Sequence, residues 1–158
     1  MIMKRFIKRL KNGSGELFAV FDESGREIYL VNSFGSGIIM NDKEGRTLLR
    51  IRQIVFRKMR LCSIYSRSSS IKLFFNPRKR GCWFYGTGWQ FVGDVYKKSF
   101  DIIDTDNSLV CSHAKSFCNG RSCYLLDITN ESDEVLCIGA AICVESMSEV
   151  ESLCPQTV

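Results

Sequence analysis

The 158-residue chain contains only two prolines, one histidine and no apolar run long enough to cross a bilayer. Its longest apolar run, residues 135–144, is about half of the roughly 20 residues that a membrane-spanning helix needs. The first ten residues carry charge but lack the apolar core and the cleavage site of a signal peptide. We therefore expect a cytoplasmic protein that is not transmembrane.

Basic residues are absent from the C-terminal part of the chain, where none follows Arg121. The first 121 residues hold all 22 Lys and Arg, whereas the remaining residues contain only acidic charges. A basic body followed by an acidic segment indicates an anionic partner, or an acidic tail that lies back on the body.

The eight cysteines are spread through apolar and alternating segments, where a thiol behaves as a small hydrophobic group. We expect them to be reduced. Cys118 and Cys123, with His113 nearby, lack the second ligand pair of a structural zinc site, so we expect no metal and no cofactor. A nucleophilic Cys82 or Cys118 would need a base, and His113 is the single candidate. We therefore expect no catalytic residues and no enzyme.

Two stretches of sequence, 13–31 and 35–51, share the order Gly-Ser-Gly, apolar strand, Asp-x-x-Gly-Arg and apolar strand. The Asp side chain can accept backbone hydrogen bonds across the turn, and Gly adopts the positive φ that the turn needs. Each stretch is therefore predicted to be a β-hairpin, and residues 100–111 form a looser third copy in which Asn107 replaces Gly. Alternation elsewhere brings the total to about twelve short strands, the last at 122–128.

The pattern changes after residue 128. Residues 129–134 supply N-cap candidates and first-turn acids, and residues 135–144 are apolar on every face. A helix of this kind must be enclosed, and Gly139, Ala140 and Ala141 keep it thin enough to thread through a barrel. A strand over 135–144 is the alternative. We expect one domain over residues 1–148 and a polar tail over 149–158.

These features together resemble a known family. The Asp-x-x-Gly hairpins, the Lys-x-Phe steps at 98–100 and 115–117, and the apolar helix after 125–128 are similar to those of LURP-one-related proteins, which belong to the tubby C-terminal-like superfamily. The resemblance runs from about Lys4 to Met147 and suggests a small bacterial member. It implies a closed antiparallel barrel of about twelve strands around a central apolar C-terminal helix, and no established activity. Tubby itself binds phosphoinositides, but none of its binding residues aligns here.

Basic clusters in predicted turns are the candidate anion-binding residues: Arg57, Lys58, Arg78, Lys79, Arg80, Lys97 and Lys98. At the rim of a barrel they could form one patch for phosphorylated lipid head groups or a membrane surface, with Trp83 or Phe84 at the interface. Exposed basic residues are more often a solvated surface that discourages strand-edge aggregation.

The function that we predict is a non-catalytic intracellular binding module for an anionic ligand. The alternative is a scaffold that binds a protein through an exposed strand or apolar patch. A cysteine-dependent enzyme is less favoured, and the sequence lacks the signatures of nucleic-acid-binding folds.

Overall fold

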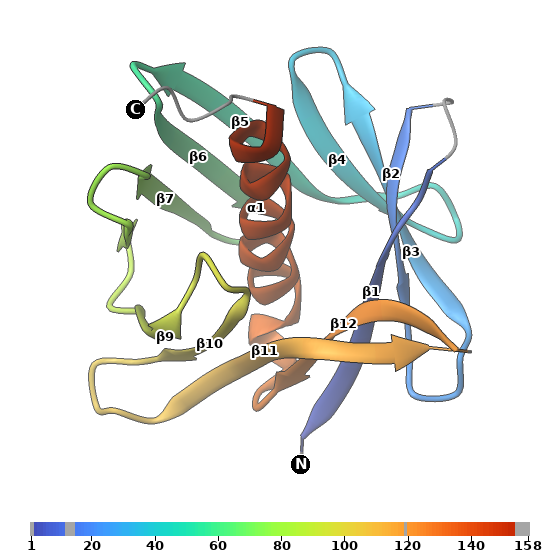
Figure 1. Ribbon diagram of the computed structural model, residues 1–158. Coiled ribbons are helices and arrows are strands. Elements are labelled where there is room, and N and C mark those ends of the chain that lie inside the picture. The colour runs from blue at the N-terminus through green and yellow to red at the C-terminus, as the bar shows by residue number, and fades with distance from the viewer. Residues whose placement is uncertain (1, 12–14, 119, 154–158) are drawn as a thin grey trace.

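In a computed structural model, the described residues form twelve β-strands followed by one long helix (Figure 1). The structure describes residues 2–11, 15–118 and 120–153, with side chains up to Ser146. The strands are β1 (Met3–Arg9), β2 (Glu16–Phe21), β3 (Glu27–Phe34), β4 (Gly37–Asp42), β5 (Thr47–Phe56), β6 (Met59–Ser66), β7 (Ser70–Asn76), β8 (Gly81–Tyr85), β9 (Gln90–Asp94), β10 (Ser99–Ile103), β11 (Leu109–Cys118) and β12 (Arg121–Ile128). They confirm the predicted number of strands.

Turn chemistry explains why the repeated stretches fold as hairpins. The Asp22 carboxylate accepts hydrogen bonds from two backbone N–H groups of its turn, at 2.9 and 3.0 Å, and Gly25 has φ of 83°. Asp42 and Gly45 repeat this arrangement. In the looser third copy, Asn107 adopts φ of 63°, as its tolerance of the left-handed region predicts.

All twelve strands belong to one antiparallel sheet, in which β1 pairs with β12 (Met3 opposite Ile128) and so brings the two ends of the sheet sequence together. The outermost strands are β8 and β9, and no strand ladder joins them in the described residues. Stacking of Phe84 on Phe91, with ring centroids 4.5 Å apart, bridges this seam. The barrel is therefore nearly closed, which confirms the predicted fold class.

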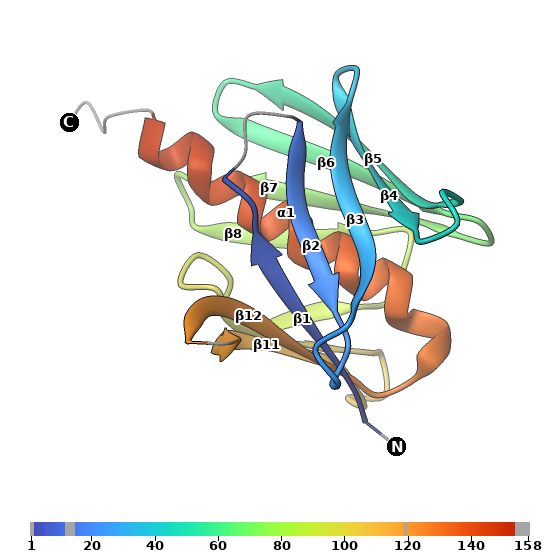
Figure 2. The same cartoon turned by 90° about the vertical axis from the view of Figure 1, so that its right-hand side faces the viewer.

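A 3₁₀ turn, η1 (Glu131–Asp133), leads into the helix α1 (Glu134–Leu153), which runs through the middle of the barrel (Figures 1 and 2). The helix spans the whole apolar run at 135–144, which excludes the strand alternative for this segment, and residues 136–145 are all buried. The helix continues beyond the apolar run at 135–144, because the polar residues that follow it remain acceptable helix formers. The last five residues of the expected tail, 154–158, lie outside the described residues.

No helix within the described residues has the length and apolar character needed to cross a membrane.

The seven cysteines in the described residues are free, and Cys154 lies outside them. Two helix thiols meet wall thiols in hydrogen-bond contact, Cys137 with Cys111 and Cys143 with Cys62. These cysteines fill the space between helix and wall as small side chains.

Close packing explains the small residues of the helix. A Cβ atom at Gly139 would lie 2.8 Å from Cγ2 of Ile64 on β6 and 3.2 Å from both Cδ atoms of Leu49 on β5. Both wall residues are buried, so neither can move into solvent. The helix therefore passes β5 and β6 at a distance that leaves no room for a side chain.

We predict that Gly139→Ala destabilises the protein, although Ala is a better helix former by about 1 kcal/mol. Overpacking against Ile64 should outweigh this gain and leave a net loss of about 1–2 kcal/mol in the free energy of unfolding, measured in urea. In a double-mutant cycle, Ile64→Ala removes the clashing methyl group, so the double variant should lose less than the two single losses together. If the stability losses of the two single variants simply add in the double variant, the close approach of the helix to Ile64 is contradicted.

Candidate anion-binding end of the barrel

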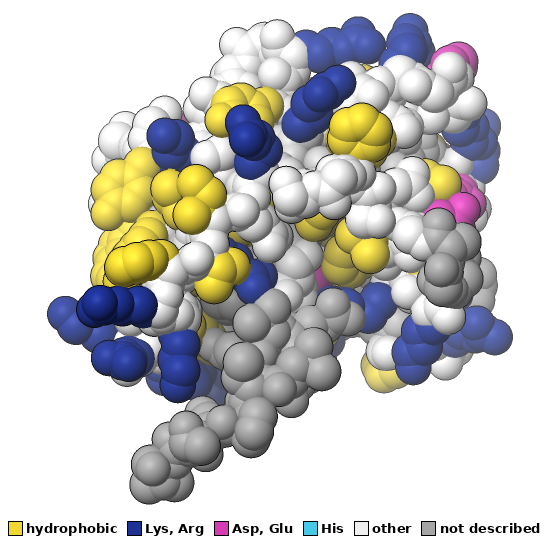
Figure 3. All heavy atoms as spheres, turned by 90° about the horizontal axis from the view of Figure 1, so that it is seen from above, with side chains coloured by type: hydrophobic (Ala, Val, Ile, Leu, Met, Phe, Trp, Pro, Cys, Tyr) yellow, Lys and Arg dark blue, Asp and Glu magenta, His cyan; other side chains and the backbone are white. Residues whose placement is uncertain are grey.

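Consecutive strands run in opposite directions, so the connections between them lie alternately at the two ends of the barrel. The connections at the end where the helix terminates carry eight basic residues and no acidic one: Lys11, Arg57, Lys58, Arg78, Lys79, Arg80, Lys97 and Lys98. Those at the opposite end, including η1, carry seven acidic and four basic residues. Seen from above the view of Figure 1, the molecule has Lys and Arg side chains at many places around its edge and few acidic ones (Figure 3).

All seven candidate residues from the sequence lie at the basic end, in three consecutive turns: β5–β6 (57–58), β7–β8 (77–80) and β9–β10 (95–98). The second and third turns touch. Arg80 Nη2 lies 3.5 Å from Asp94 Oδ1, and its guanidinium covers the ring of Tyr96 at 4.9 Å. The β5–β6 turn stands one hairpin away, and no described polar contact links it to the other two turns.

These three turns place basic residues in the left-handed region of backbone conformation. Arg57, Lys58, Arg80 and Lys98 have φ between 49° and 72°, and they are four of the five described non-glycine residues with positive φ. The fifth is Asn107, at the opposite end. A left-handed residue with a long side chain costs roughly 1–2 kcal/mol, which glycine avoids. The basic turns are therefore tolerated at a cost in stability.

Several exposed apolar side chains lie at or near the same end of the barrel. Phe34 ends β3, Ile54, Val55 and Phe56 end β5, Trp83 lies in β8, and Phe117 lies near the end of β11 with 76% of its surface exposed. The guanidinium of Arg57 lies over the ring of Phe56, 5.4 Å from its centroid. The basic end thus combines positive charge with exposed apolar groups, an unusual pairing for a merely solvated surface.

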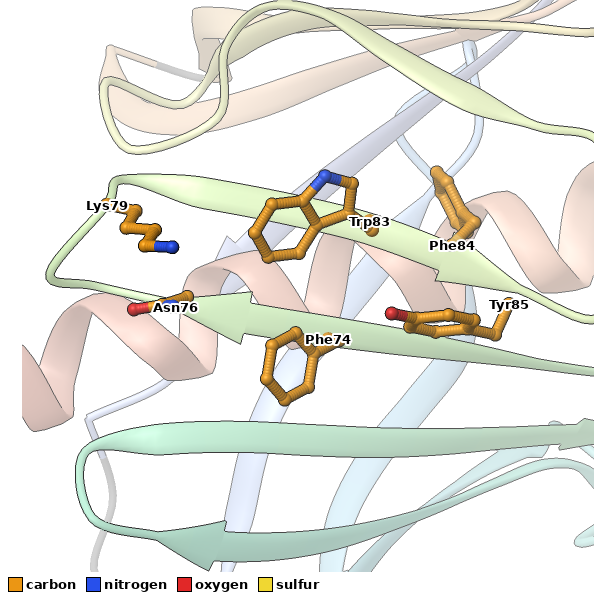
Figure 4. Close-up of a pocket in the computed structure, with 6 residues that line it drawn as sticks. All are labelled: Phe74, Asn76, Lys79, Trp83, Phe84 and Tyr85. Atoms are coloured by element: carbon orange, nitrogen blue, oxygen red, sulfur yellow. The ribbon is translucent and has the colours of Figure 1, made fainter.

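Between β7 and β8, an open groove of about 430 Å³ faces outward (Figure 4). Trp83 stacks on Phe74 across the two strands at 5.8 Å, and Lys79 lies toward the turn. Trp83 is 44% exposed, as expected of an interfacial residue. Phe84 is the other residue that the sequence suggested for the interface. It is partly buried and stacks on Phe91, so it is less available than Trp83.

A buried ion pair lies at the mouth of the barrel, inside the rim. Lys98 Nζ lies 3.2 Å from Oε2 of Glu145, which is 1% exposed, and 5.3 Å from the centroid of the Tyr124 ring. Arg9 Nη2 donates a hydrogen bond to the backbone carbonyl of Glu145 at 2.9 Å. Burial raises the pKa of the Glu145 carboxyl, and the nearby Lys98 and Arg9 oppose this shift.

His113 supports Lys98 from behind. Its Nδ1 lies 2.8 Å from the carbonyl oxygen of Lys98, which can only accept, so Nδ1 carries the hydrogen. Its ring is stacked between Phe100 and Tyr124. Desolvation is the main cause that lowers the pKa of His113 to about 4, so the ring is neutral near neutral pH. The hydrogen bond holds the strained turn in place.

Little in this arrangement favours cysteine or metal chemistry. Burial raises the pKa of the Cys82 thiol, which makes it a poorer nucleophile at neutral pH. His113, the one candidate base, already donates to Lys98 and is covered on both ring faces. Within the described residues, no group of three or more His, Cys, Asp or Glu side chains is arranged to hold a metal ion.

The sequence profile of the LURP-one-related family matches residues 3–145, almost the whole barrel and most of the helix. The chain belongs to the LURP-one-related family. A curated relative, the uncharacterized protein YxjI of Bacillus subtilis, is 25% identical over 154 residues, covering 91% of this chain and 93% of YxjI. Neither the family description nor this relative names an activity for LURP-one-related proteins.

A solved structure shares the fold of this LURP-one-related chain. It is the X-ray structure of an Arabidopsis thaliana protein, with a TM-score of 0.56, 12% sequence identity, and coverage of 95% of this chain and 91% of the plant protein. At this identity the likeness establishes the fold alone.

Two residues of the mouth were missed at the sequence level as site candidates. Glu145 follows directly on the apolar run of the helix, and Lys115 follows His113 by two residues on β11, so both strand residues face the same side. Because Lys115 lies two residues from His113 on a strand, the sequence could have placed both side chains on the same face. The position of Glu145 opposite Lys98 depends on how far the helix enters the barrel, which no local pattern specifies.

We predict that replacing the β5–β6 turn by Arg57→Asn and Lys58→Gly stabilises the protein by about 1–2 kcal/mol, because Asn-Gly suits a two-residue hairpin turn with positive φ at both positions. Thermal and urea unfolding would measure this gain. Gly45→Lys is the matched reverse change: its φ is 79° and nothing lies within 4 Å of the added Cβ, so it should lose stability through backbone strain alone. Equal stability of all three proteins would contradict the strain argument.

We also predict a pH-dependent contribution from His113. Its folded pKa of about 4 lies below the ordinary value of 6.5, so between these pH values the unfolded chain binds a proton that the folded protein excludes. The free energy of unfolding should therefore fall by up to about 3 kcal/mol as pH drops through this window.

His113→Phe tests this contribution because it retains a ring between Phe100 and Tyr124. The variant should be about 1 kcal/mol less stable at pH 7, through loss of the hydrogen bond to Lys98. The difference in the free energy of unfolding between the variant and the unmodified protein, measured in urea, should shrink or reverse toward pH 4.5. Parallel pH profiles of the two proteins would show that His113 does not titrate on unfolding.

Proposed function

We propose that the basic end of the barrel docks this protein onto an anionic membrane surface, as a non-catalytic binding module of the cytoplasm. The observation that carries the proposal is the coincidence, at one end, of connections with basic and no acidic residues and of exposed apolar side chains. Each Lys or Arg near an anionic lipid surface contributes about 1 kcal/mol of attraction. Aromatic side chains such as Trp83 and Phe117 are suited to the head-group region.

Backbone strain in the basic turns supports the same proposal. Glycine and asparagine occupy the left-handed turn positions at the opposite end, at Gly25, Gly45, Gly86 and Asn107. The barrel therefore does not require long side chains at such positions. Arg80 and Lys98 also form ion pairs with Asp94 and Glu145, but no ion pair is described for Arg57 or Lys58, so a binding role explains the presence of these two residues better than a structural one.

A specific observation also favours a second candidate, the protein scaffold. Strands β8 and β9 have no ladder between them, so both offer backbone groups to which an extended segment of a partner could pair. Salt-insensitive binding of one protein, with no affinity for anionic vesicles, would favour this alternative.

We predict that the protein co-sediments with phosphatidylcholine vesicles containing phosphatidylserine, but not with phosphatidylcholine alone, and that raising the salt concentration releases it. The fourfold change Arg57→Gln, Lys58→Gln, Arg78→Gln and Lys79→Gln should weaken binding by at least about tenfold at low salt. It should leave unfolding nearly unchanged, because exposed charges contribute little to stability.

The matched control removes four exposed basic residues remote from the basic end: Arg26→Gln, Lys43→Gln, Arg67→Gln and Lys72→Gln. The control has the same net charge as the fourfold variant. Any greater loss of vesicle binding in the fourfold variant therefore reflects where the basic residues lie and not the total charge. Phe117→Ser should also weaken binding at low salt, since it removes an exposed apolar group without changing the charge. The proposal fails if the unmodified protein ignores phosphatidylserine vesicles at low salt.

A further inference from the structure

We infer that a pocket at the mouth of the barrel binds a phosphate monoester group. The pocket has a volume of about 580 Å³ and is lined by Tyr96, Lys97, Lys98, Ser99, Lys115 and Tyr124. These residues come from three places in the chain: the β9–β10 turn with the first residue of β10, strand β11 and strand β12. The inference deepens the proposed function and rests on it only for a ligand carried by a lipid.

The ammonium group of Lys98 is fixed in position, unlike that of an ordinary surface lysine. It is bonded to Glu145 at 3.2 Å and lies over the ring of Tyr124, while its own backbone carbonyl accepts the hydrogen bond from His113. The side chain is 20% exposed, so it faces the pocket with little freedom to turn away. A ligand group bound here meets a charge that is already in place.

Lys115 approaches the same pocket from the neighbouring strand. It pairs directly with Tyr124 across the β11–β12 ladder, which places the two side chains on one face. It is also two residues beyond the inward-facing His113, so it faces the barrel mouth. Lys97 and Lys98 enter from the β9–β10 turn, and the three amines thus belong to two separate elements.

The charges match a doubly charged anion. Three lysines line the pocket with no carboxylate among the lining residues, and Glu145 beneath them is shared between Lys98 and Arg9, so at least two positive charges remain in excess. A phosphate monoester carries a charge of about −1.5 to −2 at neutral pH and has three strong acceptor oxygens. A carboxylate would leave part of the positive charge unbalanced. The hydroxyl groups of Ser99 and Tyr124 add neutral donors, and lysine binds phosphate as a point charge.

This pocket differs from the rim in what it can distinguish. Exposed turns such as 57–58 and 77–80 attract any anionic surface, because salt-screened charge is nearly blind to the shape of its partner. A recessed site with one fixed amine favours the monoester over the diester of phosphatidylserine. The volume exceeds that of phosphate alone, so the monoester can belong to a soluble molecule or to the head group of a lipid.

The test measures binding of glycerol 3-phosphate by isothermal titration, and co-sedimentation with phosphatidic acid or phosphatidylserine vesicles of matched surface charge. Lys115→Gln is the principal variant, because this exposed residue makes no contact with Glu145 and its loss should not disturb folding. Lys43→Gln, an exposed lysine at the opposite end, is the matched control. Lys98→Gln is a second variant, with its fold checked by unfolding because it leaves Glu145 with one cation fewer.

We expect glycerol 3-phosphate to bind, glycerol not to bind, and Lys115→Gln to weaken the binding at least tenfold while Lys43→Gln leaves it unchanged. A preference for phosphatidic acid that disappears in Lys115→Gln would assign the monoester to a lipid. Binding of glycerol 3-phosphate without that preference would assign it to a soluble ligand.

The inference is overturned if glycerol 3-phosphate binds no better than glycerol and phosphatidic acid binds no better than phosphatidylserine. It is also overturned if Lys115→Gln weakens neither the binding of glycerol 3-phosphate nor the preference for phosphatidic acid. Retained binding to phosphatidylserine vesicles in that case would leave membrane docking standing without the pocket. If the unmodified protein binds glycerol 3-phosphate but no vesicles, the pocket is supported and membrane docking is not.

Discussion

The depth at which α1 sits in the barrel is set by two carboxylates that bracket its apolar segment. Glu134 pairs with Arg5 at one end, and Glu145 meets Arg9 and Lys98 at the other. The two glutamates are separated by about 16 Å along the helix, and Arg5 and Arg9 by about 13 Å along β1. These lengths agree to within the reach of the side chains. Together with the close packing at Gly139, these ion pairs fix the register of the helix against the wall.

The same pairs explain how the uneven charge of the chain is distributed. The sequence left two possibilities for the acidic C-terminal segment, an anionic partner for the basic body or a segment that lies back on that body. Glu134 and Glu145 do lie back, and each neutralises basic residues inside the barrel. The connections at the basic end carry basic residues and no acidic one. Internal pairing therefore uses these two acids of the segment.

Most of the architecture could be predicted from short-range patterns. The turns at Asp22 and Asp42 and the all-round apolar run before Glu145 each carry a local cause for the element that they form. The gathering of the candidate residues at one end was also accessible, because alternate connections of an antiparallel barrel share an end. The seam between β8 and β9 was not, since barrel closure depends on the tilt and stagger of all the strands. The meeting of Lys98 with Glu145 depends on helix depth in the same non-local way.

Left-handed basic residues are confined to one side of the basic end, and this asymmetry constrains how the end can be used. Its other connections have glycine at the left-handed positions, at Gly15, Gly35 and Gly120. The strained turns instead cluster between β5 and β10, beside Phe56 and Trp83 and next to the pocket over Lys98. A flat anionic surface meeting such an end would contact this side first. The barrel axis would then be tilted relative to the surface, with the pocket turned toward it. The strained turns would lie only in the part of the end that makes contact.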